Sequence, residues 1–305
     1  MTSDASPPNA RITDERLHAV LEGVQAVTGL EVADAQLIKF TNNAVFFLPH
    51  AHVVARIAGS ATMADRIMKV IKVARWLELG SVPAVRLLEI EQPLVIDDLH
   101  LTLWHTVSGG GPKPTGADLA TILRQWHQLE PPREGLPAWN PLEEIRSRLA
   151  EPDGVEAADV AYLHGECDRI EADLARLTYV LPAGPIHGDA FMGNLIDGKS
   201  GPVICDFDSS CDGPREWDFV PLAVGKLRFD YPGDNYGELA DEYGFDVTQW
   251  SGFPVLRRLR ELKLVTSLVP VLGSRDVLRP QWQTRMNSYR SGDQITRWST
   301  YVGAA

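Results

Sequence analysis

Cysteine, positive charge and long apolar runs are all scarce in this chain of 305 residues. The three cysteines, Cys167, Cys205 and Cys211, lack metal-ligand spacing, and their odd number fits a reduced cytoplasmic protein. No run of about 18 apolar residues occurs, so we expect no span across a membrane. Residues 1–10 are polar and Pro-rich, and they predict a disordered lead-in instead of a secretory signal.

Lysine and arginine number 29 against 41 aspartates and glutamates, which gives a formal net charge of −12. Nucleic-acid binding depends on basic patches, so we expect no nucleic-acid partner. Two interpretations of the acidic excess stay open: an acidic cleft that attracts a cationic small substrate, or charge that serves only solubility. The charge therefore limits the partners without naming one.

Three common catalytic signatures are also missing. The eight histidines show no zinc-binding spacing such as H-E-x-x-H, and no G-x-S-x-G nucleophile elbow occurs. Gly109, Gly110 and Gly111 are not followed by the Lys-Ser/Thr pair of a phosphate-binding loop, so they predict a flexible segment at a hinge. Zinc chemistry and nucleophile-elbow hydrolysis thus have no support in the sequence.

The hydrophobic pattern divides the chain into a β-rich first third and a mainly helical remainder. Helices are expected at 12–28 and 63–79, and strands within 35–57 and at 85–90, 93–96 and 101–107. After the Gly/Pro-rich stretch 108–114, helices are predicted at 116–129, 141–149, 155–177, 217–227, 236–244, 254–272 and 281–301, with short strands at 185–186, 195–196 and 203–204. We therefore expect an α+β fold with a small β-rich lobe over 1–104, a larger mainly helical lobe over 105–305, and a hinge near 104–114.

The most informative residues lie between positions 185 and 208. Asp189 and Asn194 are five positions apart, and Asp206 follows Asp189 by 17 positions (206 − 189). Phosphoryl transfer from a nucleotide to a hydroxyl needs these residue types: one Asp that takes the hydroxyl proton, and an Asn and a second Asp that hold magnesium. Protein kinases carry the same order in their H-R-D-x-x-x-x-N loop and later D-F-G. The spacing therefore predicts a phosphotransferase.

Through these motifs the chain resembles the aminoglycoside phosphotransferase and choline kinase-like family, which has the bilobal protein-kinase-like fold. The family's H-G-D-x-x-x-x-N loop matches His187-Gly188-Asp189 and Asn194, its I-D-x-x motif matches Cys205-Asp206-Phe207-Asp208, and its G-x-x-x-x-D element matches Gly213 to Asp218. The layout of the first lobe agrees as well, so the resemblance covers most of the chain. It implies nucleotide binding in the first lobe, and catalysis and substrate binding in the second.

The resemblance implies a role for each residue of the first two motifs. Asp189 is expected to be the catalytic base, which accepts the proton of the substrate hydroxyl or at least orients that hydroxyl. Asn194 and Asp206 are expected to bind Mg²⁺ through oxygen atoms, the donors that this cation prefers. Two interpretations of Asp208 stay open: a further metal contact, or a cap of the following loop.

His187 and Asp218 are expected to support the catalytic loop without reacting. The family's loop histidine is mainly structural, so His187 should hydrogen-bond the backbone near the metal-binding Asp206. Asp218 resembles a family residue that braces the loop. The alternative for Asp218 is an ordinary acidic residue at the start of a helix.

The nucleotide side departs from the kinase pattern. In the kinase-like fold a Lys on the third strand grips the phosphates and pairs with a Glu on the following helix. Arg56 takes the place of that Lys here, and its guanidinium can bind a phosphate with two N–H groups. The position of the Glu falls near Lys69 or Val70, so either Asp65 serves Arg56 or the ion pair is absent.

The resemblance also places two segments that contact the nucleotide. Asn42 and Asn43 lie in a turn that is similar to the family's nucleotide loop, where they and backbone N–H groups could contact phosphates. A plain hairpin turn is the alternative there. Residues 103–107 resemble the hinge whose backbone hydrogen-bonds adenine, which assigns His105 and Val107 to the nucleotide.

The sequence thus predicts phosphorylation of a hydroxyl on a small molecule, with ATP and Mg²⁺ as cofactors and GTP not excluded. An aminoglycoside or another cationic antibiotic is one candidate acceptor. A small metabolite of the choline, homoserine or thiosugar type is an alternative. A catalytically inactive nucleotide-binding protein is another, because Arg56 and the missing Glu depart from the kinase pattern. The oligomeric state is not predicted.

Overall fold

The computed structural model describes residues 13–40, 43–58 and 61–301, apart from the side chains of residues 61–65. None of the described helices is long and apolar enough to cross a membrane. The chain divides into two compact units. The first holds the described residues up to Lys113 together with Pro132–Glu134 and Asn194–Ser210, and the second holds the rest. The lobe limits of 104 and 105 stay a prediction, and the expected disordered lead-in at 1–10 lies outside the described residues.

The first unit is built on a five-stranded sheet in the order β1-β2-β3-β5-β4, in which all neighbours are antiparallel. Its strands are β1 (Gln36–Phe40), β2 (Asn43–Leu48), β3 (Val53–Ala58), β4 (Leu94–Ile96) and β5 (Leu99–His105). Along β3, the side chains of Val53, Ala55 and Ile57 are buried and those between them are less so. Such alternation marks a strand with one face on a core, and the antiparallel strands expected in this part of the chain are confirmed.

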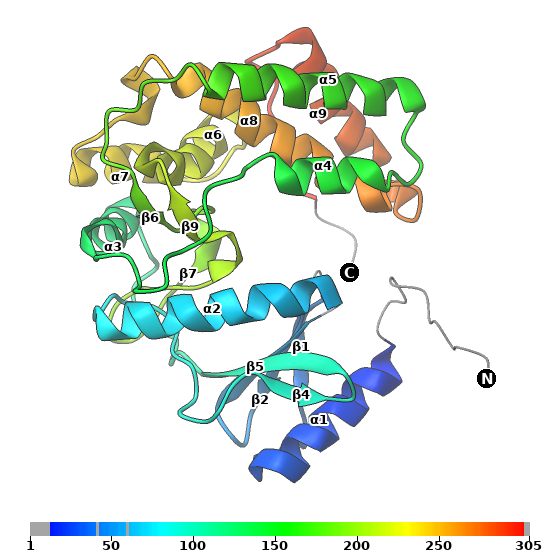
Figure 1. Cartoon of the computed structure of the whole chain (residues 1–305), viewed down its shortest axis with the longest axis vertical. Coiled ribbons are helices and arrows are strands. Elements are labelled where there is room, and N and C mark those ends of the chain that lie inside the picture. Colours follow the sequence, from blue (N-terminus) through cyan, green and yellow to red (C-terminus); the bar gives the residue numbers. More distant parts are fainter. Residues whose placement is uncertain (1–12, 41–42, 59–60, 302–305) are drawn as a thin grey trace. The chain divides into compact units, whose positions relative to one another are not determined.

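Helix α1 (Asp14–Thr28) covers one face of this sheet (Figure 1). Thr13 caps its start by accepting a hydrogen bond from the Arg16 N–H at 3.3 Å, and Gly29 ends it with a φ of 74°. The apolar side of α1 forms one hydrophobic core with the inward side chains of β2, β3 and β5. Arg56 lies between two of these inward residues of β3, so its side chain points to the opposite face of the sheet.

The other elements of the first unit bring the expected metal-binding residues to the sheet. Helix α2 (Ala61–Leu79) packs against β3, β5 and the short helix η2 (Phe207–Ser209). The hairpin of β7 (Leu195–Ile196) and β8 (Val203–Ile204) belongs to the same unit. The segment from Asn194 to Ser210 therefore packs with the β-rich part of the chain, although it lies far along the sequence.

The strand predicted at residues 85–90 is wrong. Val85 donates its N–H to Ile204 of β8, whereas Leu88 donates its N–H to Leu103 of β5. Because the backbone divides between two partner strands, it forms isolated bridges near Leu87 and no continuous ladder.

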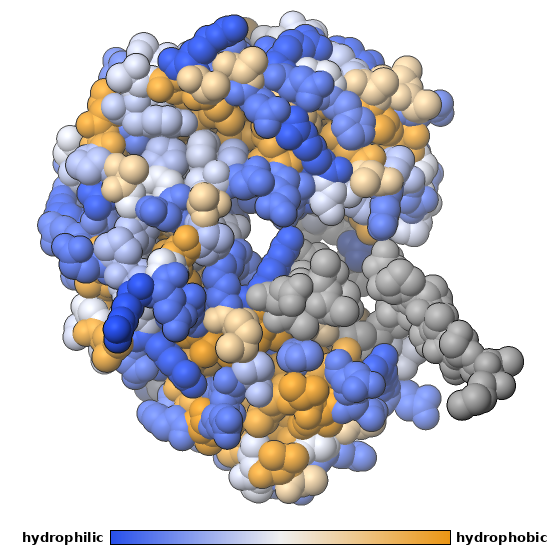
Figure 2. Space-filling model, viewed as in Figure 1, coloured by the Kyte–Doolittle hydropathy of each residue, from blue (hydrophilic) through white to orange (hydrophobic). Residues whose placement is uncertain are grey.

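The second unit is mainly helical, as predicted, and hydrophilic residues cover much of its helices on the face drawn in Figure 2. Its longer helices are α3 (Gly116–Gln128), α4 (Glu143–Ala150), α5 (Ala157–Leu174), α6 (Val220–Arg228), α7 (Asn235–Tyr243), α8 (Phe253–Thr266) and α9 (Arg279–Ser291). Strand β6 (Gly184–Ile186) pairs antiparallel with β9 (Cys211–Gly213), a strand that the sequence did not predict.

Two of the predicted helices are shorter than expected. The last one ends at Ser291 and does not reach residue 301, because Gly292 takes a φ of 70°, the left-handed conformation that stops a helix. Helix α8 ends at Thr266, well before residue 272, and the short helix η5 (Val269–Val271) follows it. In a continued α-helix the ring of Pro270 would clash with the carbonyl of Thr266, four residues earlier, which favours the end of the helix there.

Candidate active site

In the second unit, Asp218 holds the loop that follows β6. Its Oδ2 accepts the N–H of His187 at 2.8 Å, and its Oδ1 accepts the N–H of Gly188 at 2.7 Å. Asp218 is fully buried, and the neighbouring Trp217 donates its Nε1–H to the Gly188 carbonyl at 2.8 Å. Gly188 has a φ of 82°, which favours glycine. A single carboxylate thus fixes two consecutive peptide N–H groups just before Asp189, as a bracing residue would.

A histidine that the sequence did not single out supports this carboxylate. Nε2 of His127, from α3, lies 3.0 Å from Oδ2 of Asp218, and its Nδ1 lies 2.9 Å from the hydroxyl of Tyr243 in α7. The side chains of His127 and Asp218 are both almost completely buried. No motif marks His127, which lies on an ordinary amphipathic helix, so only the fold reveals its role.

His187 shapes the same loop from inside the second unit. Its ring is buried and tilted against Trp126, with 5.4 Å between the ring centroids. Its Nδ1 accepts the backbone N–H of Asp189 at 3.3 Å. This contact fits the structural role expected of His187, whereas the expected hydrogen bond to the backbone near Asp206 stays a prediction.

The carboxylate of Asp189 pairs with an arginine from a distant helix. Nη1 of Arg260, in α8, lies 2.6 Å from Oδ1 of Asp189. Burial alone raises the pKa of Asp189, but the charges of Arg260 and Lys263 outweigh it and lower that pKa to about 2. The group is therefore ionised throughout the neutral range. No motif marks Arg260, because basic residues are common on helices of this kind.

In the first unit, Asn194 and Asp206 lie at the same end of the β7–β8 hairpin. Leu195 pairs with Ile204, and the next backbone hydrogen bond joins the Cys205 N–H to the Asn194 carbonyl at 2.9 Å. Asp206 has a φ of 69°, a left-handed conformation that costs a non-glycine residue about 1 kcal/mol or more. Such strain persists only where the surroundings impose it, and it concentrates at functional sites.

The donor atoms of this hairpin end suit magnesium. Within the described residues, no three His, Cys, Asp or Glu side chains form a metal-binding cluster. Mg²⁺ does not need one, because it is usually held by one or two carboxylates while water and substrate phosphates fill its other positions. The exposed carboxylate of Asp206 and the amide of Asn194 provide oxygen donors of this kind.

Asp208 pairs with Arg56. Nη2 of Arg56 donates to Oδ2 of Asp208, and Nζ of Lys69, from α2, donates to the Asp208 carbonyl. Burial alone raises the pKa of Asp208, but Arg56 holds it below its ordinary value. The sequence analysis left two alternatives for Arg56: an ion pair with Asp65, or no ion pair. The side chain of Asp65 lies outside the described residues, and the pairing with Asp208 is not predicted by the sequence.

The remaining nucleotide residues are placed as follows. Asn43 begins β2 opposite Ala58, whereas Asn42 lies outside the described residues. His105 ends β5, and its backbone N–H donates to the Arg86 carbonyl at 2.9 Å, so this group already has a protein partner. Val107 follows two residues later in a segment without regular structure. The contacts of these residues with a nucleotide stay predictions.

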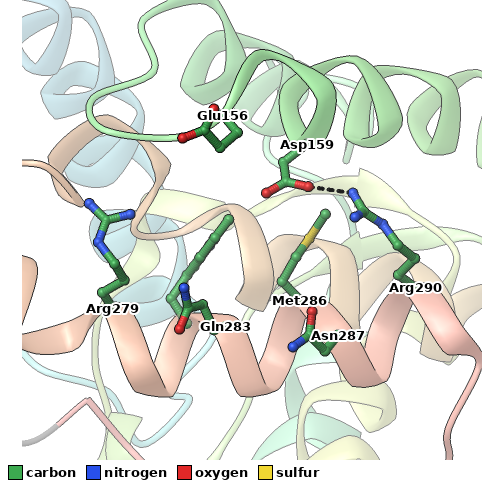
Figure 3. A pocket seen from close by; sticks show the side chains of 8 residues that line it. Glu156, Asp159, Arg279, Gln283, Met286, Asn287 and Arg290 are labelled. Carbon is green, nitrogen blue, oxygen red and sulfur yellow. Dashed lines mark hydrogen bonds and ion pairs between the residues drawn. The ribbon is translucent and has the colours of Figure 1, made fainter.

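A pocket of about 440 Å³ lies between the start of α5 and α9 in the second unit (Figure 3). Its charged lining residues are two acids, Glu156 and Asp159, and two bases, Arg279 and Arg290. Asp159 and Arg290 form an ion pair at 2.5 Å. The lining includes none of the predicted site residues, and its charges balance, so the pocket does not favour a ligand of either sign.

The model of the phosphotransferase enzyme family matches residues 38–262 of this chain. The solved structure of amicoumacin kinase hAmiN, in complex with AMP-PNP, Ca²⁺ and Ami, is 14% identical with a TM-score of 0.69, over 94% of this chain and 96% of that one. A choline/ethanolamine kinase family protein from Mesorhizobium loti is 16% identical with a TM-score of 0.63, over 91% and 93% of the two chains. The GDP and kanamycin complex of APH(2")-IIia is 16% identical with a TM-score of 0.65, over 91% and 99%.

No curated protein matches the chain by sequence. The likeness to the solved structures shows the fold, and it confirms the protein-kinase-like α+β architecture that the motifs implied. The family model covers most of the chain, including the loop of Asp189 and the segment of Asp206 and Asp208. The chain therefore belongs to the phosphotransferase enzyme family.

Proposed function

We propose that this protein transfers the γ-phosphate of ATP to a hydroxyl of a small molecule, with Asp189 as the catalytic base and Mg²⁺ as the metal. The observation that carries the proposal is the state of Asp189. Arg260 keeps the carboxylate of Asp189 ionised. The two residues before Asp189 are fixed, because the buried Asp218 accepts both of their backbone N–H groups. A fixed, ionised carboxylate is what an incoming hydroxyl needs as its hydrogen-bond acceptor.

In this reaction the acceptor oxygen bonds to the γ-phosphorus while the bond from that phosphorus to the β–γ bridging oxygen breaks and releases ADP. A carboxylate with a pKa of about 2 is a weak base. Asp189 therefore first orients the hydroxyl, and it receives the proton late, when bond formation has made the hydroxyl acidic. Most of the rate enhancement then comes from positioning, because phosphoryl transfer requires little covalent chemistry from the protein.

The segment of Asn194 and Asp206 is suited to hold the metal, and Arg56 to bind the phosphates. When bound, Mg²⁺ neutralises the charge that develops on the phosphate oxygens. Asp206 would supply a carboxylate oxygen and Asn194 an amide oxygen. Arg56 would supply N–H donors in the planar geometry that matches a phosphate.

Two classes of acceptor are supported by the similar structures. The names of two of them include amicoumacin kinase and a kanamycin complex, which supports an antibiotic with a reactive hydroxyl. Another belongs to the choline/ethanolamine kinase family, which supports a small metabolite alcohol. AMP-PNP occurs with the first and GDP with another, so both ATP and GTP belong in the test.

The test is a panel of hydroxyl acceptors incubated with the protein, Mg²⁺ and either ATP or GTP. It measures release of the nucleoside diphosphate, and mass spectrometry identifies the phosphorylated product. Asp189→Asn serves as the matched inactive variant. Nucleotide binding without acceptor-stimulated turnover across the panel would favour an inactive nucleotide-binding protein, whereas no binding of either nucleotide would contradict the proposal altogether.

A further inference from the structure

In the first unit, Arg56 and Asp208 are 152 positions apart in the sequence but form one ion pair. Their side chains are only 17% and 18% exposed, so the pair is largely shielded from water. Partly buried pairs are screened less and are held more firmly than pairs on a surface. The contact therefore determines where the guanidinium of Arg56 points.

The surroundings of the pair keep both partners in place. Arg56 lies opposite Thr102 in the β3–β5 ladder, on the face of the sheet away from α1. The ring of Phe207, next to Asp208, packs against Trp104 of β5 with 6.2 Å between the ring centroids. Lys69 of α2 donates to the Asp208 carbonyl. Strands β3 and β5, helix α2 and the segment that carries Asp208 therefore all pack around this ion pair, within the first unit.

We propose that Asp208 is the positioning residue of Arg56: it orients the guanidinium for the nucleotide phosphates, and it is not a metal ligand. The inference rests on the proposed ATP-dependent function. In kinases the basic phosphate-binding residue must be held by an acidic partner, which lies on the helix. In this chain the helix carries Lys69 near that position, and an acid that pairs with Arg56, Asp208, lies two residues after Asp206. The acidic partner has changed place, and the ion pair is retained.

The chemistry of arginine makes this arrangement workable. A guanidinium has five N–H donors in one plane, so it can bond a carboxylate along one edge and a phosphate along another. A lysine ammonium is a point charge and has no such edges. Arg56 can therefore keep Asp208 as its partner while its other N–H groups bind a phosphate.

The experiment measures binding of ADP by calorimetry with EDTA present, so that no metal contributes. Asp208→Asn is nearly isosteric, and it should weaken ADP binding about tenfold, because the guanidinium loses its charged partner. Arg56→Gln should weaken ADP binding by at least as much. The double variant should bind like Arg56→Gln alone, since the two residues act as a unit. Asp212→Asn, an exposed carboxylate four residues further on, should bind ADP like the wild type.

A second measurement separates positioning from metal binding. The Mg²⁺ concentration that gives half-maximal turnover should rise in Asp206→Asn and stay unchanged in Asp208→Asn. Circular dichroism and thermal melting show whether each variant is folded. If Asp208→Asn is unstable, Asp208→Glu, which keeps the charge, should restore metal-free ADP binding to within about threefold of the wild type.

Three outcomes would overturn the inference. Unchanged metal-free ADP binding in Asp208→Asn, together with a raised Mg²⁺ requirement, would show that Asp208 is a metal ligand. Additive losses in the double variant would show that the two residues act separately. A wild-type protein that binds no nucleotide under any condition would overturn the proposed function, and this inference with it. The first two outcomes overturn the inference alone, because they require a wild-type protein that binds ADP or turns over.

Discussion

Arg260 and Asp189 are 71 positions apart, yet Nη1 of the arginine lies 2.6 Å from Oδ1 of the aspartate. Their side chains are 10% and 27% exposed, so the aspartate can still be reached from solvent while the arginine is nearly enclosed. An arginine in this position keeps the carboxylate charged and limits its rotation. It also makes the proton affinity of the proposed catalytic base depend on α8.

Replacing Asp189 by Asn should nearly abolish turnover. The amide keeps the size of the side chain but cannot accept a proton, and general bases contribute about 10²- to 10⁴-fold to a rate. We expect kcat to fall about 10³-fold in an assay of nucleoside diphosphate release. Nucleotide affinity should stay within about twofold, because Asp189 is not expected to touch the donor. A variant that retains the wild-type kcat would contradict the proposed role.

Replacing Arg260 by Met should shift the acid limb of the pH–rate profile. The wild-type pKa of Asp189 is about 2, so its protonation lies below the range in which the enzyme can be assayed. Without Arg260, the largest charge that opposes the effect of burial is lost, so the pKa of Asp189 rises and the acid limb moves to higher pH. The activity of the variant relative to the wild type should therefore fall as the pH falls.

Lys263→Met provides the graded control for this profile. Lys263 acts on Asp189 through charge, whereas Arg260 acts through charge and a hydrogen bond, so the shift should have the same sign but be smaller. Equal pH profiles for wild type and Arg260→Met would show that the ion pair does not set the proton affinity of Asp189.

The same ion pair should make the stability of the fold depend on pH. The pKa of Asp189 is lower in the folded protein than in the unfolded chain, so the carboxylate stabilises the fold above its unfolded pKa. This contribution is about 2 kcal/mol in the free energy of unfolding, and it disappears as the pH falls from about 4 to about 2. Urea unfolding of wild type and Asp189→Asn at several pH values measures it. A stability difference that stays constant down to pH 2 would be the contrary result.

Replacing Asp218 by Asn should cost both stability and activity. The amide can accept only one of the two N–H groups of His187 and Gly188, and its NH₂ group faces the other donor. We expect a loss of about 2–3 kcal/mol in the free energy of unfolding and a lower kcat, because the loop before Asp189 loses its anchor. Asp212→Asn, which is exposed, should stay within about 0.5 kcal/mol of the wild type in the same urea titration.

The proposed reactive residues could be named from the sequence, whereas some of the residues that support them could not. Asp189, Asn194 and Asp206 are recognisable because the reaction fixes both their types and their spacing. Arg260 and His127 were missed, because each reaches its partner across the second unit from a helix whose sequence is unremarkable. The sequence marks Asp208 as a candidate site residue but does not predict its pairing with Arg56. A contact between residues 152 positions apart depends on tertiary packing and leaves no local sequence pattern.

In the fold, too, some elements could be predicted from the sequence and others could not. The alternation along β3 and the apolar side of α1 were visible in the sequence, because periodic burial leaves a periodic pattern. The stretch at 85–90 has the composition of a strand, yet its N–H groups go to two different strands. Composition cannot show how a backbone distributes its hydrogen bonds. The early ends of α8 and α9 depended on Pro270 and Gly292, which act through backbone geometry.

The buried carboxylate of Asp218 has a consequence for substrate binding at the proposed active site. The peptide groups of His187 and Gly188 are tied to it in the structure as it stands, and His127 and Tyr243 secure it in turn. The conformational entropy of this loop is therefore lost during folding, and it does not have to be lost again at each encounter. Under the proposed function, an acceptor that reaches Asp189 would meet a preorganised loop, and its binding energy would remain available for aligning the hydroxyl with the phosphate.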